Sequence, residues 1–362
     1  MKVLEQYLNP QENLDLQYGA VLQDLGGQMT FPLTEHPTWA IRDSSKLDDW
    51  LTCPRKYFYL HILGWRLDIP SHDLHFGSAW HKAREHQLIH GYSDVEGAYT
   101  AFLNEYRKHF DPETDELYKP KNPTAVLNAL MQFASERQSD LIDNEVVVLD
   151  GTPMTEVSGT VPVDDKRLIH YRMDSVMHKL DDDKYFSWDH KSTSGKWIHD
   201  TRWDEDLYLS FQNGTYTHCL YCMFPIEQVL GVEFIKTGFE HLERGSKNRP
   251  AGYHATTRYI PAFKTPDQMN VWLWSVNRRL DEIEREMDLL HHCKEEDEVL
   301  MAFPQNPKSC TAYGGCSFHD FCLSWSNPLQ RAYEPPLGYR TDFWDPSTVK
   351  TTVKKDLNWR EI

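Results

Sequence analysis

Two aspartates and a lysine occur at a spacing that suits metal-dependent hydrolysis of phosphodiesters. Asp174 lies in one stretch of alternating apolar and polar residues, and Asp189 and Lys191 lie in the next. Such alternation predicts two β-strands, in which every second side chain points to the same face. The acidic run at 181–183 predicts the turn between them, and a turn centred between residues 181 and 182 places Asp174 directly opposite Asp189. We therefore expect two carboxylates and one amine to meet on one patch.

This grouping has the chemistry of a nuclease site. Mg²⁺ and Mn²⁺ prefer carboxylate oxygens, and Mg²⁺ accepts a substrate phosphate as a further ligand. A divalent ion activates water and neutralises charge that develops on phosphorus, and a nearby amine adds to that stabilisation. The same residues also fit an ordinary surface hairpin with alternating charge, because short motifs match many unrelated sequences.

Four of the seven cysteines could form a second centre. Cys310, Cys316 and Cys322 are close together in sequence, and Cys53 lies far upstream. Four thiolates can hold an iron–sulfur cluster, and they suit a tetrahedral zinc ion equally. Unconnected buried thiols are the third alternative.

The helices and strands that would position these residues are predicted from the spacing of apolar residues, which changes along the chain. Apolar periodicity and capping residues predict helices at 44–65 with an interruption at Pro54, at 77–91, at 94–142 with a loop around 111–123, at 204–223 and at 265–290. Alternation predicts strands at 154–163, 168–178, 185–191, 228–236 and 254–260. The first helix is expected to be capped by Ser45 with Asp48, and the last by a capping box of Thr265 and Gln268. The pattern favours an α/β fold with a central mixed β-sheet flanked by helices.

Composition limits the class of protein. The net charge of -17 argues against a general polyanion binder, although residues 244–264 contain five Lys or Arg residues and no acidic residue. Cations interleaved with aromatic residues suit single-stranded nucleic acid, and an exposed basic hairpin is the plain alternative. No apolar run is long enough for a membrane span, and the amino terminus is too polar for a signal peptide. We expect a cytoplasmic protein without membrane contact.

The motifs together resemble those of the PD-(D/E)XK nucleases, and within them the RecB-like exonuclease branch. That branch has G-x-x-x-H on a helix, then a strand with G-[RK]-[IVM]-D, a strand with [DE]-x-K and a helix with Q-x-x-x-Y. The matching segments are 77–81, 171–174, 189–191 and 212–216. Tyr171 replaces the usual glycine.

The resemblance implies roles for individual residues. His81, Asp174 and Asp189 would bind Mg²⁺ or Mn²⁺, with the carbonyl of His190 as a further ligand. Lys191 would assist the attacking water. Gln212 and Tyr216 would steady the site or contact the nucleic acid, and Glu156 resembles an accessory acid of some members.

The cysteines also resemble a family pattern. AddB-type nucleases and CRISPR-associated RecB-like nucleases carry one cysteine before the nuclease motifs and three after them, around a 4Fe-4S cluster. The segment 45–57 matches the phrase around the first of these cysteines. The resemblance implies a structural 4Fe-4S cluster held by Cys53, Cys310, Cys316 and Cys322. The first gap of the final triplet is wider here than in the family, with Tyr313 at the usual position.

The lack of a clear period in the first 40 residues predicts an N-terminal extension at 1–43, and the Pro-containing end predicts an extended C-terminal tail at 326–362. The resemblance implies a nuclease domain at 44–325, with a restriction-endonuclease-like core and a cluster-stapled helical cap. The expected activity is that of a metal-dependent DNA exonuclease, acting on single strands or ended duplexes in recombination, repair, CRISPR adaptation or phage replication, with a recombination or replication protein as partner. The residues expected to contact DNA are Arg55, Lys56, Lys196, Arg244, Lys247, Arg249 and Arg258. A catalytically idle DNA-binding scaffold and a redox iron–sulfur protein are the alternatives.

Overall fold

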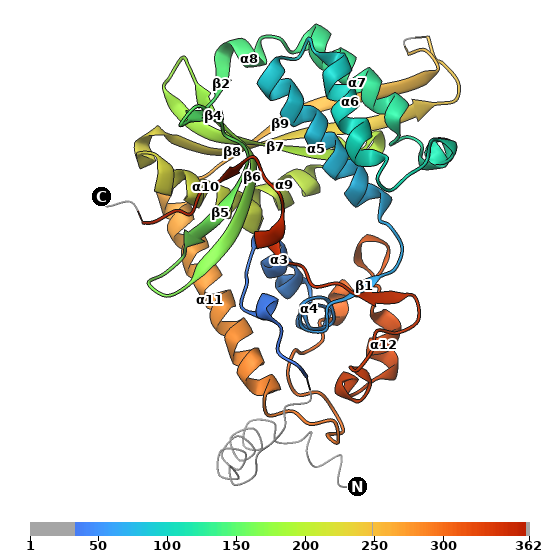
Figure 1. Ribbon diagram of the computed structural model, residues 1–362, viewed down its shortest axis with the longest axis vertical. Coiled ribbons are helices and arrows are strands. Elements are labelled where there is room, and N and C mark those ends of the chain that lie inside the picture. The colour runs from blue at the N-terminus through green and yellow to red at the C-terminus, as the bar shows by residue number, and fades with distance from the viewer. Residues whose placement is uncertain (1–32, 248, 360–362) are drawn as a thin grey trace.

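Within residues 33–247 and 249–359, which the computed structural model describes, a mixed seven-stranded β-sheet forms the centre of the protein (Figure 1). Its strands lie in the order β11-β5-β6-β7-β8-β9, and β2 pairs with β6. The pairs β7–β8 and β11–β5 are parallel, and the other pairs are antiparallel. The strands are β2 (Asn144–Val146), β5 (Thr155–Pro162), β6 (Leu168–Lys179), β7 (Lys184–Ser194), β8 (Val229–Leu242), β9 (Gly252–Phe263) and β11 (Val353–Lys354).

Helices cover both faces of this sheet, as the sequence predicts. On one side lie α5 (His72–His90), α6 (Val95–Tyr106) and α7 (Pro123–Glu136), whose aromatic residues share an apolar cluster with Trp188 and Phe239 of the sheet. On the other side lie α3 (Ser44–Thr52), α10 (Phe211–Met223) and α11 (Pro266–Leu290), which share a second cluster with Met173 and Val232. The two clusters make a layered α/β architecture in which the sheet is buried on both faces.

Helix boundaries follow local capping, and three of them differ from the expectation. The capping box of Thr265 and Gln268 is confirmed at the start of α11. The predicted single helix at 204–223 is wrong: α9 (Thr201–Leu209) and α10 are separate, because the Ser210 side chain caps α10. The expected start at Gly77 is wrong because α5 begins at His72, and Asp43 caps α3 in place of Ser45.

Segments from near the two ends of the described chain lie together in a smaller unit below the sheet, whereas the last described residues return to the sheet at β11 (Figure 1). There β1 (Trp65–Leu67) pairs with β10 (Tyr339–Thr341), and Trp65 and Phe321 of α12 (His319–Ser324) pack edge to face. The C-terminal region, expected to be an extended tail, is held to the fold by β10 and by β11, which pairs with β5. No helix in the described ranges is both long and apolar enough to cross a bilayer.

Arg55 fastens this unit internally, which corrects its expected role as a DNA contact. The side chain is 4% exposed, so a phosphate has little access to it. The guanidinium donates hydrogen bonds to the carbonyl oxygens of Phe303 (2.9 Å), Leu300 (3.1 Å) and Ala302 (3.5 Å). These bonds join α4 (Pro54–Tyr57) to a segment that is distant in sequence, since Arg55 and Phe303 are 248 positions apart.

Replacing Arg55 by Ala is expected to lower the free energy of unfolding by about 3 kcal/mol, because buried carbonyl groups lose a charged donor. Lys56→Ala is the matched control: Lys56 is half-buried and its ammonium pairs with Asp49 at 2.7 Å, an interaction expected to contribute at most about 1 kcal/mol. Denaturant titration of both variants measures the difference. Equal stabilities would contradict the structural role of Arg55.

Candidate metal centre and active site

The β6–β7 hairpin brings the two aspartates of the motif together. Its register pairs Ser175 with Trp188 and Lys179 with Lys184, which confirms the turn centre predicted from the acidic run. The pairing ends at Ser175 and Trp188, and the next residues on the two strands, Asp174 and Asp189, are both buried, 7% and 1% exposed. The His190 backbone N–H donates a hydrogen bond of 2.8 Å to Asp174 Oδ2, which fixes the orientation of that carboxylate.

His81 and Glu156 complete a set of ligand atoms around Asp174. His81 lies on α5, and its Nδ1 is 3.0 Å from Asp174 Oδ1. Glu156 lies on β5 beside Asp174 with a φ of 46°, a left-handed backbone conformation that costs a non-glycine residue about 1–2 kcal/mol. Ligand atoms of His81, Glu156 and Asp174 all lie within 4.8 Å of one another. The set therefore fits one divalent ion with an imidazole nitrogen and two carboxylates.

Asp189 has a different environment from the other two acids. Its Oδ1 is 2.6 Å from Lys191 Nζ, and its Oδ2 accepts a 2.9 Å hydrogen bond from Gln212 Nε2. Lys191 also donates to Gln212 Oε1 at 2.8 Å. The expected metal ligands Asp189 and His190 lie beside the three-residue set but outside it, so their role as ligands stays a prediction. Both ring nitrogens of buried His190 have no hydrogen-bond partner among the described residues.

Helix α10 holds the polar network around Asp189. Gln212 and Tyr216 are four positions apart and face the sheet, as expected for one helical turn. Gln212 Nε2 donates to the Tyr216 hydroxyl at 2.9 Å, and that hydroxyl donates to the Arg172 carbonyl oxygen of β6. The network ties Lys191 to a rigid helix start, which the Ser210 cap defines.

Crowded negative charge shifts the protonation of this site. Burial and then the charge of Asp174 raise the pKa of Glu156. Burial also raises the pKa of Asp189, in spite of Lys191. Burial disfavours charge on Asp174 and on His81, but their mutual attraction and hydrogen bond hold the pKa of Asp174 well below its usual range and raise that of His81. Positive charge is therefore favoured here, and a divalent ion would supply it.

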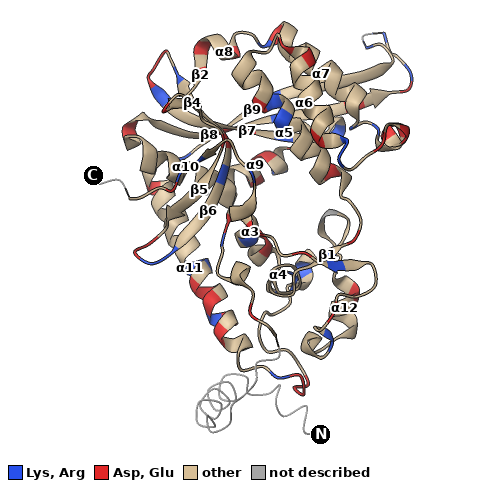
Figure 2. Ribbon diagram, in the orientation of Figure 1, with Lys and Arg blue, Asp and Glu red and all other residues tan. Residues whose placement is uncertain are grey.

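The cations expected along a nucleic-acid path are unevenly available. Arg244 and Lys247 are exposed near the outer end of the β8–β9 hairpin, and Lys196 is exposed beside Trp197. Figure 2 shows Lys and Arg on this hairpin and several acidic residues along α11.

Two other predicted cations have acidic partners. Arg249 pairs with Glu240 at 2.8 Å. Arg258 pairs with Asp204 at 3.0 Å and donates to the Ile198 carbonyl oxygen, which gives it a structural role.

The four predicted cluster cysteines share one region. The Asn306 N–H donates to Cys53 Sγ at 3.3 Å. Burial raises the pKa of the Cys322 thiol to about 11, with Cys53, Cys316 and Cys310 adding to the rise. Among the described residues no three of these thiols come within the 4.8 Å that marks the His81 set, whereas thiolates around one zinc ion would lie about 4 Å apart. The described thiols therefore do not form a ready single-ion site.

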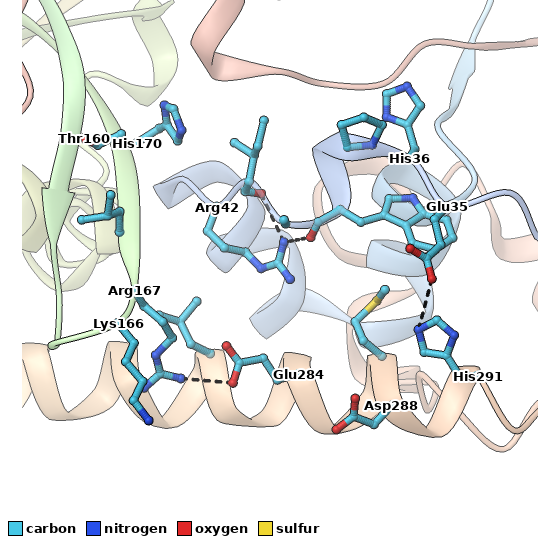
Figure 3. A pocket seen from close by; sticks show the side chains of 17 residues that line it. Glu35, His36, Arg42, Thr160, Lys166, Arg167, His170, Glu284, Asp288 and His291 are labelled. Carbon is cyan, nitrogen blue, oxygen red and sulfur yellow. Dashed lines mark hydrogen bonds and ion pairs between the residues drawn. The ribbon is translucent and has the colours of Figure 1, made fainter.

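A separate cavity of about 800 Å³ lies away from the hairpin acids, between the segment 35–42, β6 and α11 (Figure 3). Arg167 and Glu284 form an ion pair of 3.5 Å in its wall. None of the metal-set residues lines it, so its volume does not identify the reaction site.

Comparison with known proteins agrees with the geometry. A sequence model described as the PD-(D/E)XK nuclease superfamily matches residues 44–322, which include His81, Glu156, Asp174, Asp189 and Lys191. No curated protein matches the chain.

The affinity of the metal-free protein for Mn²⁺ is expected to rise with pH through the raised pKa of His81. Only the neutral imidazole binds a metal, so below that pKa the affinity should fall about tenfold per pH unit. Calorimetric titrations across pH test this. The His81→Asn protein should bind Mn²⁺ more weakly. At pH values above those at which carboxyl groups titrate, its Mn²⁺ affinity should change little with pH. A wild-type affinity independent of pH would contradict a ligand role for His81.

Proposed function

The chain belongs to the PD-(D/E)XK nuclease superfamily, and from this premise we propose that it hydrolyses DNA phosphodiesters with Mg²⁺ or Mn²⁺. Family membership implies a metal-dependent nuclease. The observation that supports this for the chain itself is the meeting of His81, Glu156 and Asp174 within 4.8 Å, next to an ordered lysine. A scaffold subunit without activity would have no need of such a set.

The residues of the site would have different roles in the reaction. His81, Glu156 and Asp174 would hold a divalent ion, which activates water and neutralises charge on the phosphate. Lys191 is positioned by Asp189 and Gln212, so its ammonium can orient water or stabilise developing negative charge. Asp189 holds the Lys191 ammonium in place, and its carboxylate would be a further ligand of a bound ion.

The proposed substrate is a DNA end or a single strand. A pocket of about 260 Å³ is lined by Lys191, Gln212 and Tyr216 but by none of the three metal-set residues, so it would take a strand on the Lys191 side of the site. Exposed Arg244, Lys247 and Lys196 offer contacts to the phosphate backbone, which carry no sequence information. Exonuclease action in recombination, repair, CRISPR adaptation or phage replication, beside a recombination or replication protein partner, belongs to the same proposal and rests on the resemblance of the motifs.

A structural 4Fe-4S cluster held by Cys53, Cys310, Cys316 and Cys322 is a further part of the proposal. The support is that the four cysteines lie in the smaller unit below the sheet, where the Asn306 N–H donates to Cys53 Sγ, Gln305 donates to the Cys322 carbonyl oxygen, and the Cys316 N–H donates to the Cys310 carbonyl oxygen. A cluster has four iron atoms, so its thiolates lie further apart than the ligands of a single ion. Its role would be to fasten that unit, since a link between distant positions removes much chain entropy.

Asp174→Asn and Lys191→Met are each expected to lower kcat for Mg²⁺-dependent DNA cleavage by about a thousandfold or more, because each removes a group that acts on the reacting phosphate. Asp183→Asn and Lys179→Met are matched controls at the far end of the same hairpin. End-labelled DNA on gels measures the rates, and circular dichroism checks folding. Folded Asp174→Asn and Lys191→Met proteins with wild-type activity would contradict the proposed site.

Anaerobically purified protein is expected to contain about four iron atoms per chain and to absorb visible light. Cys316→Ser and Cys322→Ser should lose the iron, whereas Cys222→Ser, in α10, should retain it. Elemental analysis also measures zinc. Stoichiometric zinc, or iron unaffected by substitution of Cys316 and Cys322, would contradict the cluster.

A further inference from the structure

We propose that the pocket of about 260 Å³ beside Lys191 binds the phosphate-bearing end of a nucleic-acid strand, with Arg172 as the residue that holds the phosphate. This inference rests on the proposed function and specifies its substrate further. The pocket is formed by the start of α3, by β6, by the catalytic network and by the C-terminal segment. The lining residues that bear on a ligand are Asp43, Asp48, Arg172, Lys191, Gln212 and Trp344.

Arg172 is the cation in this pocket that other groups leave available. The other one, Lys191, is bound to Asp189 and Gln212. Arg172 is exposed, and no carboxylate of the described residues lies within ion-pair distance of its guanidinium, although Glu156 and Asp174 attract it from further away. A planar guanidinium binds a phosphate through two parallel hydrogen bonds, which makes an unpaired arginine a suitable phosphate ligand.

Two acids, Asp43 and Asp48, also line the pocket, and both carboxylate oxygens of Asp43 already accept hydrogen bonds. Asp43 accepts from the Lys46 N–H at 2.8 Å through Oδ1 and from Trp344 Nε1 at 2.6 Å through Oδ2. Asp48 is exposed to solvent, and partial desolvation, with the charges of Asp49 and Asp43, raises its pKa to about 7, so about half of these carboxyl groups are ionised at pH 7. The Ser44 and Ser45 side chains are present as neutral hydrogen-bonding groups. Repulsion of an entering phosphate is thereby reduced.

The C-terminal segment forms one wall of the pocket through Trp344, Pro346 and Val349. Trp344 is fixed by its bond to Asp43, and the Tyr171 hydroxyl donates to the Lys355 carbonyl oxygen at 2.6 Å. Pairing of β11 with β5 holds the following residues. A volume of 260 Å³ is the space of about nine water molecules. Such a space accepts a phosphate with its sugar, but a continuing strand would meet the fixed wall.

The spacing of Arg172 and Asp174 links this pocket to the reaction. The two residues are two positions apart on one face of β6, and in an extended strand their Cα atoms are about 7 Å apart. Neighbouring phosphates in a single strand have a similar separation. A terminal phosphate at Arg172 would place the next phosphate at Asp174. The scissile bond would then lie one nucleotide from the end, and the products would be mononucleotides.

Binding without cleavage tests this inference separately from the proposed activity. Full-length protein in EDTA is titrated with fluorescent oligonucleotides carrying a 5′-phosphate, a 3′-phosphate or only hydroxyl ends, and with a circular strand. One phosphorylated end should bind about tenfold more tightly than the hydroxyl form, as expected for charge-assisted hydrogen bonds. Which end gains affinity identifies the polarity. The circular strand should bind no better than the hydroxyl form.

Arg172→Met should reduce the preference to within about twofold, and Arg172→Lys should keep part of it. Arg202→Met, which changes an exposed arginine of α9, should leave it intact. Equal affinity for phosphorylated and hydroxyl ends, or a preference that survives Arg172→Met, would overturn the inference. A protein that prefers phosphorylated ends but cleaves no DNA would overturn the proposed function and leave this pocket standing.

Discussion

The structure depends on how it accommodates three buried carboxylates in one small volume. Asp174, Asp189 and Glu156 are each at most 7% exposed, and burial of like charges is unfavourable unless opposite charges or donors compensate it. The protein supplies one donor set to each acid: His81 and the His190 N–H to Asp174, Lys191 and Gln212 to Asp189, and Lys82, at 3.8 Å, to Glu156. These nearby donors offset part of the buried negative charge, and a divalent cation would offset the rest.

The secondary structure places these donors with little freedom. Helix α5 supplies His81 and Lys82, the hairpin supplies Asp174, Asp189 and Lys191, and α10 supplies Gln212. Apolar layers on both sides of the sheet hold the helices in place, so the polar groups keep their orientation without a ligand. The left-handed backbone at Glu156 is the local conformational cost of bringing a third acid to this point.

The sequence predicts the part of the site that depends on local rules. The hairpin register follows from its acidic turn, and Gln212 and Tyr216 follow from helical spacing. The prominence of Glu156 in the metal set is not predictable in this way, since its position depends on a backbone conformation that has no clear sequence signal. The resemblance of the motifs indicates Glu156 only as an accessory acid, and its place in the strand predicted at 154–163 adds no further signal.

Long-range burial explains the other differences. Arg55 looks like a DNA contact in sequence because the carbonyl groups that bind it lie 245 or more positions away. The C-terminal segment looks like a free tail because its short strands, β10 and β11, carry too few residues for a periodic signal. In both cases the structure depends on a contact with a segment that is distant in sequence, and local sequence does not predict such a contact.

The location of a bound metal tests the account most directly. Crystals grown with Mn²⁺ should show an anomalous difference peak about 2.0–2.3 Å from ligand atoms of His81, Glu156 and Asp174. Lys191 should lie beside it without contacting it. A well-diffracting crystal with those side chains ordered and no peak among them, or with the ion bound only at another site, would contradict the central claim that crowded acids here are completed by a divalent ion.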